Sequence, residues 1–165
     1  MIVCIFCAAV LGIITREEAD DEYKLKLPLG LQKEALYLPL ENTLTHDKIA
    51  LGKQLFFDQR LSRDHTVACA SCHNPRFGFT DGQSVPTGIE GQQGRRSTST
   101  ILNRAFSKEQ FWDGRATDLE DQAKKSMVHP VEMGFTHDGV IERLRGIKGY
   151  REQFEKTFGT GGVIL

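Results

Sequence analysis

Hydrophobic residues recur at helical spacing in four stretches of the chain, and long polar segments separate these stretches. In residues 45–58, Leu51 and Leu55 fall on one helical face, and Thr45 stands where a helix cap belongs. A turn follows, and residues 69–72 are expected to form a short helix. Because no stretch shows the pattern of a strand, the sequence predicts a mostly helical domain.

The other three helices are predicted in the second half of the chain. Thr117 and Glu120 have the spacing of a capping box, so one helix should run from about Asp118 towards Met127 before Pro130 ends it. A second helix is indicated by the capping residue Thr136 and by the inward residues Val140, Ile141 and Leu144. A third is indicated by aromatic residues at four-residue spacing, namely Tyr150, Phe154 and Phe158. The predicted fold class is therefore all-α.

Two segments lack helical periodicity. Residues 16–44 are polar with scattered leucines, and we interpret them as a linker and a wrapping arm. Residues 74–100 hold five glycines and two prolines, which predict a long loop. A loop of this length in a compact domain usually serves a functional site.

The chain begins with an uncharged apolar run from Met1 to Ile14, which includes Cys4 and Cys7. The run has the length of a signal-peptide core and is too short to span a membrane comfortably. We predict a signal peptide over residues 1–15, and therefore export to the periplasm; a buried first helix is the alternative.

Size and charge describe an ordinary globular protein. The 165 residues suit one domain with a modest core, and 39% of them are hydrophobic and 26% charged. The formal net charge is -1, and lysine and arginine are dispersed along the chain. Nucleic acid and acidic membrane surfaces are therefore not expected as partners, and no stable membrane span is predicted.

The strongest chemical signal is the sequence Cys69-Ala70-Ser71-Cys72-His73. This spacing is typical of a c-type haem, because the two thiols can form thioethers with the vinyl edge and the imidazole can then ligate the iron. Half of a zinc site or a thioredoxin-like redox pair would use the same two cysteines. Zinc would require a second ligand pair, and a redox pair would require a strand context, and neither is evident here. The long loop after residue 74 also fits a haem, whose faces would replace the missing core.

Beyond this motif, seven blocks resemble the N-terminal haem domain of bacterial dihaem cytochrome c peroxidases, a family that includes MauG-like proteins. They come in the family's order and cover about residues 45–160, for which the resemblance implies a cytochrome c-like haem domain with long loops. The blocks are LGKQLFFDQRLSRD, CASCHNP, FTDG, GQQGRRSTSTILN, FWDGRA, LEDQA and HPVEMG.

The resemblance assigns roles to individual residues. It makes His73 the proximal iron ligand, and it makes Trp112 an electron relay between two haems, although a lone tryptophan is otherwise more often a packing residue. Gln122 and Glu132 match a distal amide and carboxylate that bind peroxide and move its protons. Without the resemblance, Glu132 would be read as an exposed turn residue.

Four positions depart from the family pattern. Ile89 stands where many relatives carry a histidine that blocks the iron, which predicts an open sixth position unless His129 or Met133 coordinates. His129 and Ser126 replace an asparagine and a proline near the distal pocket, and His129 is a candidate additional acid–base group or a solvated loop residue. Ser97 replaces an asparagine that helps to bind calcium between the domains in relatives, and such a calcium ion is a further expectation. The four departures are therefore Ile89, Ser97, Ser126 and His129.

The expected function is reduction of hydrogen peroxide to water with electrons from a small cytochrome c or copper protein. Because the sequence holds one CxxCH motif, we interpret the chain as the peroxidatic half of a dihaem enzyme, with residues 161–165 starting a second domain that carries the second haem. Homodimer formation is left open. The alternatives are a monohaem electron carrier, for which Met133 would be the second ligand, and a MauG-like oxidase of a protein side chain.

Overall fold

The computed structural model describes residues 22–39, 41–159 and 163. The predicted signal peptide lies outside these residues, as does the chain end apart from Val163. Within the described ranges the chain is helical, and its only β-type pairings are isolated bridges. The helices are α1 (His46–Phe56), α2 (Cys69–Cys72), α3 (Leu119–Val128), α4 (His137–Gly146) and α5 (Lys148–Phe158), with short 3-10 turns η1 (Lys33–Ala35), η2 (Gln59–Leu61), η3 (Pro75–Phe77), η4 (Ile89–Gly91) and η5 (Arg104–Phe106).

Two of the predicted helix caps are confirmed. The hydroxyl of Thr45 accepts a hydrogen bond from the backbone N–H of Lys48 at 3.2 Å, and α1 then runs to Phe56. Thr136 caps α4 in the same way through the N–H of Gly139 at 3.0 Å. In both places a side-chain oxygen satisfies a backbone donor that has no partner within the helix.

The predicted cap of α3 is wrong by one residue. Asp118 is the cap, and its carboxylate accepts from the N–H of Asp121 at 2.7 Å. Thr117 lies one position earlier, where its hydroxyl donates to Asp118 and its N–H donates to Asp121. A carboxylate at this position is also favoured by the helix dipole, which explains why the aspartate takes the role.

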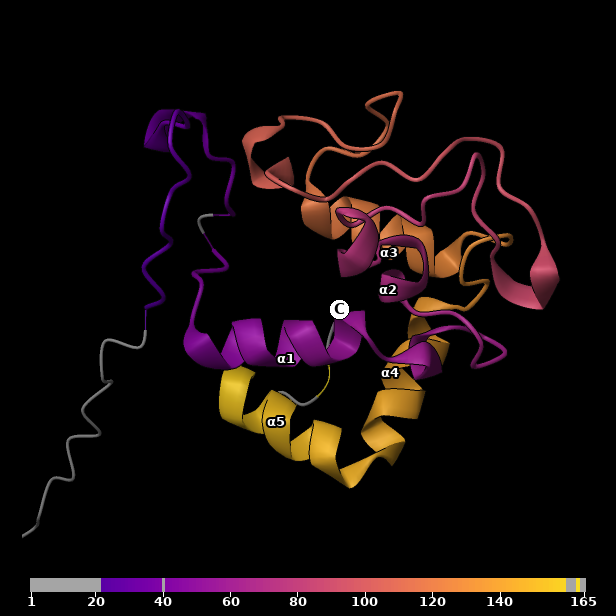
Figure 1. Ribbon diagram of the computed structural model, residues 1–165. Helices are drawn as coiled ribbons and strands as arrows, with labels where there is room; N and C mark the ends of the chain where they lie inside the picture. The colour runs from indigo at the N-terminus through magenta and orange to yellow at the C-terminus, as the bar shows by residue number, and fades with distance from the viewer. Residues whose placement is uncertain (1–21, 40, 160–162, 164–165) are drawn as a thin grey trace, which may run out of the picture.

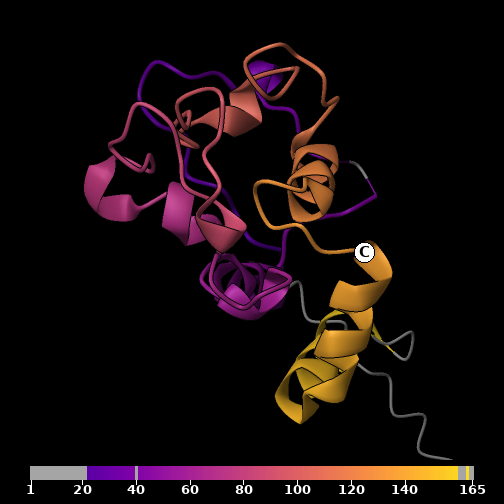
Figure 2. The same ribbon diagram turned by 90° about the vertical axis from the view of Figure 1, so that its right-hand side faces the viewer.

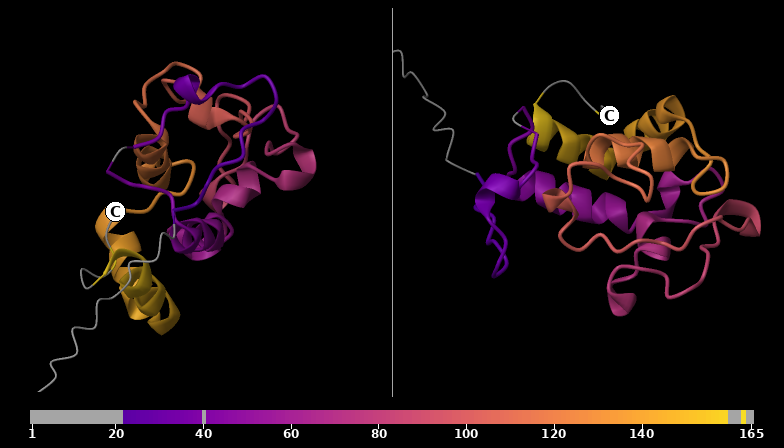
Figure 3. Two further views of the ribbon diagram at one scale, coloured as in Figure 1. Left: turned by 90° about the vertical axis from the view of Figure 1, so that its left-hand side faces the viewer. Right: turned by 90° about the horizontal axis from the view of Figure 1, so that it is seen from above.

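Helices α1, α4 and α5 form the compact end of the molecule (Figure 1). Helix α5 lies along α1 and also packs on α4, and both contacts are visible when the molecule is seen from above (right panel of Figure 3). The spacing correctly predicts that α4 and α5 bury Val140, Leu144, Tyr150 and Phe154. Ile141 is only partly buried, and Phe158, at the end of α5, is 42% exposed. The core consists of Leu51, Leu61, Met133, Val140, Leu144, Tyr150, Phe154 and Val163.

Helix α1 and the remaining chain form a ring beside this core. Figure 2 shows α1, α2, the loop after residue 80, α3 and the segment 22–39 surrounding a central space. Hydrogen bonds hold that N-terminal segment in place, from Tyr23 N–H to the carbonyl of Leu44 at 2.8 Å and from Tyr37 N–H to the carbonyl of Ala105 at 2.7 Å. None of the helices among the described residues combines the length and the apolar character needed to cross a membrane.

Arg143 of α4 joins the core to the segment before α2. Its guanidinium donates to the carbonyls of Arg60 at 2.7 Å and Ser62 at 2.6 Å, and it lies over the ring of Phe135. The carbonyl groups of Arg60 and Ser62 thus accept charge-assisted hydrogen bonds from one guanidinium group. These contacts tie α4 to the chain between α1 and α2.

Asp58 links the same segment to α5. Its carboxylate accepts from the buried hydroxyl of Tyr150 at 2.5 Å and from two guanidinium nitrogens of Arg60 at 2.6 to 3.0 Å. The hydrogen bonds from Arg60 and Tyr150 lower the pKa of Asp58 to about 2. Burial, together with the bond to Asp58, raises the pKa of Tyr150 to about 12.

We expect Asp58→Asn to lower the free energy of unfolding by about 1–2 kcal/mol at neutral pH. Because the pKa of the folded-state carboxyl lies below its ordinary value of 3.8, its contribution is present above that pH and is lost as the pH falls through about 2. Urea unfolding between neutral and acid pH should therefore show a flatter acid limb in the variant. Glu152→Gln, which removes an exposed pair with Lys148, is the control and should change little. An unchanged acid limb in Asp58→Asn would contradict the assignment.

Candidate functional site

A cavity of about 1260 Å³ occupies the space inside the ring. It exceeds the roughly 300–1,000 Å³ that is usual for small-molecule pockets, and its walls are mainly apolar, as a large flat cofactor would require. Residues from α1, α2, α3, the N-terminal segment and the long loop contribute to the walls. Every residue that the sequence nominated for the site lines it: Cys69, Cys72, His73, Trp112, Gln122 and Glu132.

His73 follows directly after α2, and its ring is oriented by the hairpin that comes next. Asn74 and Thr80 form an antiparallel bridge, which brings the carbonyl of Phe79 to 3.2 Å from Nδ1 of His73. A carbonyl oxygen can only accept, so Nδ1 carries the proton and Nε2 keeps its lone pair. This is the arrangement that prepares an imidazole to bind a metal through Nε2.

The two cysteines lie one helical turn apart on α2 and are not joined by a disulfide. Burial raises the pKa of the Cys69 thiol, and burial together with the charge of Asp81 raises the pKa of Cys72 to about 11. Redox-active pairs have lowered values instead, so these thiols do not have the character of a thioredoxin-like pair. Within the described ranges, no three His, Cys, Asp or Glu side chains are grouped to hold a metal ion, which leaves zinc without further ligands there.

Glu132 lies on a tight turn between α3 and α4. The carbonyl of His129 accepts from the N–H groups of Glu132 at 3.1 Å and Gly134 at 2.9 Å, while the carbonyl of Glu132 accepts from Ile89 N–H at 3.1 Å. Gly88 packs so closely on this turn that a Cβ there would overlap the carbonyl oxygen of Val131. The backbone of Glu132 is therefore held from both sides, which fixes where its carboxylate enters the cavity.

We expect Gly88→Ala to displace this turn and to destabilise the protein by about 1–3 kcal/mol, the usual cost of overpacking. Chemical denaturation measures the loss. Gly149→Ala in α5 is the matched control, because a Cβ there meets nothing within 4 Å and alanine favours a helix. Equal stability of Gly88→Ala and the wild-type protein would show that the loop can move away from the turn without cost.

Gln122 and Ser126 come from α3, one turn apart, and both line the cavity. Helix α3 lies across the ring from α2 (Figure 2), and Gln122 of α3 lines the cavity together with Cys69 and Cys72 of α2. The cavity is therefore lined by an amide and a carboxylate, from Gln122 and Glu132. It is also lined by the two thiols and the imidazole of the CxxCH segment.

Trp112 borders the cavity yet is 64% exposed. Its indole N–H donates to the carbonyl of Ser97 at 2.8 Å, and the next residue, Asp113, pairs with Arg96 at 2.9 Å and Arg115 at 2.8 Å. The ring is not part of the core that α1, α4 and α5 form in this chain. The loop is nevertheless well fastened, so the indole is held between the cavity and the exterior.

Three residues matter for the prediction that the sixth coordination position of the iron is open. Ile89, which stands in place of the family's blocking histidine, is fully buried against Gly134, and the cavity walls do not include it. Met133 lines the cavity but belongs to the buried core, with an exposed fraction of 4%. His129 lines the cavity, and its imidazole is 44% exposed.

The sequence analysis missed several groups around the site. The Phe79 carbonyl that orients His73 depends on a left-handed backbone at Phe79 (φ 61°), which nothing in the residue type signals. Asp81 was noted only as part of a family block, although its charge acts on Cys72 and one of its carboxylate oxygens is buried without a partner. Four arginines of the cavity wall were also missed: Arg95, Arg96, Arg104 and Arg115.

A helical, loop-rich fold that places a CxxCH segment on a large cavity defines the class of cytochrome c-like haem domains. Sequence comparison gives the family: the family model of the di-haem cytochrome c peroxidases matches residues 46–164, and the chain belongs to this family. The predicted resemblance and the predicted helical, cytochrome c-like fold are both confirmed.

Individual relatives carry both names used in the family. The methylamine utilization protein MauG of Methylophilus methylotrophus is 40% identical over 162 residues, which are 96% of this chain and 48% of that protein. The cytochrome c551 peroxidase of Nitrosomonas europaea is 42% identical over 119 residues, 72% of this chain and 36% of that protein. The chain thus spans about half or less of the length of these relatives.

A solved structure has the same fold. A MauG-like protein associated with microbial copper homeostasis superposes with a TM-score of 0.75 at 29% identity, and the match covers 82% of this chain and 40% of that one. The diheme peroxidase BthA of Burkholderia thailandensis gives a TM-score of 0.63 at 25% identity, over 74% of this chain and 36% of that one.

Proposed function

We propose that the cavity binds one c-type haem and that the loaded chain reduces hydrogen peroxide to water. Cys69 and Cys72 would hold the haem through thioethers, and His73 would ligate the iron through Nε2. The observation that carries this proposal is the cavity itself, which brings these three residues together with Gln122 and Glu132. The orientation of His73 by Phe79 supports the choice of iron ligand.

The chain's own residues would handle substrate and protons. A bound haem would supply the redox chemistry of its iron. The amide of Gln122 can hold peroxide by hydrogen bonds, and the Glu132 carboxylate can take the proton of one peroxide oxygen and deliver it to the other. Because the turn that carries Glu132 is fastened to the loop at Gly88 and Ile89, little reorganisation is needed when peroxide arrives.

Electrons would enter from a donor of the cytochrome c or small copper protein class. Trp112 is the residue we assign to this path, since it touches both the cavity and the exterior. We further propose that the chain acts after export to the periplasm and as the peroxidatic half of a dihaem protein. Calcium binding between the domains and homodimer formation stay predictions.

One experiment distinguishes the proposed peroxidase from a monohaem electron carrier and from a MauG-like oxidase. The haem-loaded chain is mixed with hydrogen peroxide and a chemical reductant, and loss of peroxide is followed. Consumption supports the peroxidase, whereas a monohaem electron carrier would leave peroxide intact and show a low-spin ferric spectrum with two protein ligands. A MauG-like oxidase is the second candidate because relatives with that name match most of the chain, and it would be recognised by oxidation of a partner protein.

A further inference from the structure

The turn that borders the cavity carries two titratable side chains that meet. Nδ1 of His129 lies 3.7 Å from a carboxylate oxygen of Glu132. The N–H of Val131 also points at this nitrogen, at 3.4 Å, so Nδ1 acts as an acceptor and Nε2 carries the proton in this arrangement. The imidazole is 44% exposed and the carboxylate 35%, and both residues line the cavity, so the pair connects the cavity with solvent.

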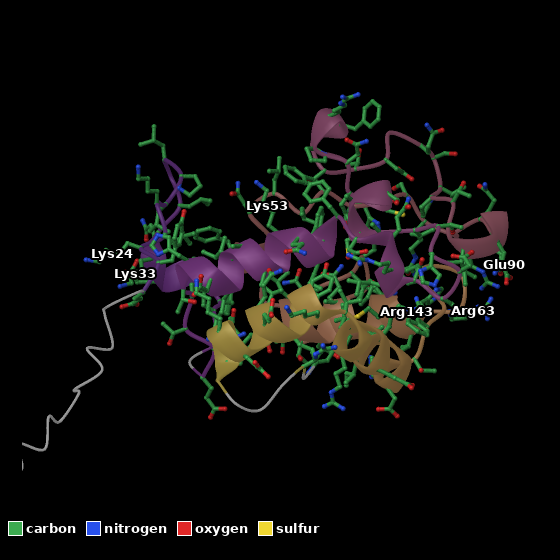
Figure 4. All side chains as sticks on the ribbon, turned by 90° about the horizontal axis from the view of Figure 1, so that it is seen from below. Lys24, Lys33, Lys53, Arg63, Glu90 and Arg143 are labelled. Carbon is green, nitrogen blue, oxygen red and sulfur yellow. The ribbon has the colours of Figure 1, made fainter. Side chains whose placement is uncertain are left out.

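Other charged side chains near this turn form ion pairs with each other. Figure 4 shows Arg63 and Glu90 together at the edge of the molecule. The backbone N–H of Arg63 donates to the carbonyl of Met133 at 2.9 Å, which places this pair next to the turn. The charge of Glu132 also acts on the thiols of α2, which would become uncharged thioethers on haem attachment. On α4, His137 is bound to the carbonyl of Lys124 at 3.0 Å. The neighbouring ion pairs are Arg63 with Glu90 and Asp121 with Lys125, both at 2.6 Å.

We propose that His129 is a positioning residue that relays protons from solvent to Glu132, which rests on the proposed peroxidase function. Reduction of hydrogen peroxide breaks the O–O bond, and two electrons and two protons are consumed to give two water molecules. The electrons come from the cytochrome-class donor. The two protons that are consumed are not those of the substrate, so they must enter the cavity from solvent.

The geometry of the turn suits this supply. Both side chains line the cavity and both are partly exposed, so the pair can exchange protons with water as well as with a molecule in the cavity. An imidazole changes its protonation state between about pH 5 and 8, so it can accept a proton from water and pass it on. When Nδ1 takes up a proton it can no longer accept from the Val131 N–H, and a carboxylate oxygen of Glu132 lies 3.7 Å away as an acceptor for that proton.

The test compares the haem-loaded variants His129→Asn and His65→Asn in stopped-flow reactions with peroxide across that pH range. His65 is an exposed histidine that does not line this cavity, so it is the matched control. We expect His129→Asn to lose the histidine-dependent step of the pH profile and to be about tenfold slower near neutral pH, while His65→Asn follows the wild-type protein. An unchanged profile in His129→Asn would overturn the relay.

A second readout does not depend on turnover. The free energies of unfolding of His129→Asn, Glu132→Gln and the double variant form a cycle that measures the coupling of the two side chains. Because only a protonated imidazole attracts a carboxylate, we expect a favourable coupling in acid solution that is absent in alkaline solution. If the two side chains show no coupling at either pH, the proposed interaction between His129 and Glu132 is wrong. If the wild-type chain does not consume peroxide, the proposed function itself fails, which is a different outcome from an active enzyme that is indifferent to His129→Asn.

Discussion

Glu132→Gln will slow the reaction of the haem-loaded chain with hydrogen peroxide by about 10²–10⁴-fold, the usual contribution of a positioned acid–base group. The amide keeps the size and polarity of the side chain but cannot take a proton from one oxygen of peroxide and return it to the other. The backbone hydrogen bonds that hold the turn involve the N–H and carbonyl of Glu132, so they stay intact. Stopped-flow spectroscopy of the Soret band measures the rate.

The control for this prediction is Glu142→Gln on α4, which removes an exposed carboxylate outside the cavity wall. Its rate should equal that of the wild-type chain. The Soret spectrum before peroxide is added should be the same in all three proteins, which separates lost chemistry from lost haem. A Glu132→Gln variant that reacts at nearly the wild-type rate would remove the carboxylate from the mechanism.

Replacing both Cys69 and Cys72 by serine will abolish covalent haem. A hydroxyl does not form the thioether that a thiol forms with a vinyl group, so the cofactor could be held only by His73 and the cavity walls. Either single variant should keep one bond. The measurement is the mass of the denatured chain, together with haem staining after denaturing electrophoresis, for protein made alongside a cytochrome c maturation system.

Ala70→Ser serves as the control, because it adds a hydroxyl to the same short helix and keeps both sulfurs. It should carry haem like the wild-type chain. Covalent haem in the double variant would place the attachment at another cysteine and would contradict the assignment of the CxxCH motif.

Local patterns were sufficient to predict most of the helices. The caps at Thr45 and Thr136 and the inward spacing in α4 and α5 depend on residues within a few positions of each other, so the sequence contains all that is needed. The cap of α3 shows how close such predictions come, since Thr117 and Asp118 are both good capping residues and the structure selects the aspartate.

The arrangement of the ring could not be predicted in this way. It depends on contacts between distant residues, such as Arg143 with the carbonyl of Ser62 and Tyr37 with the carbonyl of Ala105. The loop also turns through left-handed backbone at Phe79 and similar non-glycine positions, which residue type does not signal. The nominated site residues were found through their order in a family pattern, whereas their common cavity is a property of the fold.

The position of Trp112 has a practical consequence for spectroscopy. It is the sole tryptophan of the chain and borders the cavity while remaining largely in water. Indole emission overlaps the absorption of a porphyrin, so a haem seated nearby will quench it by energy transfer. Fluorescence excited at the red edge, where tyrosine does not contribute, will therefore report the fraction of molecules that carry the cofactor without any label being added.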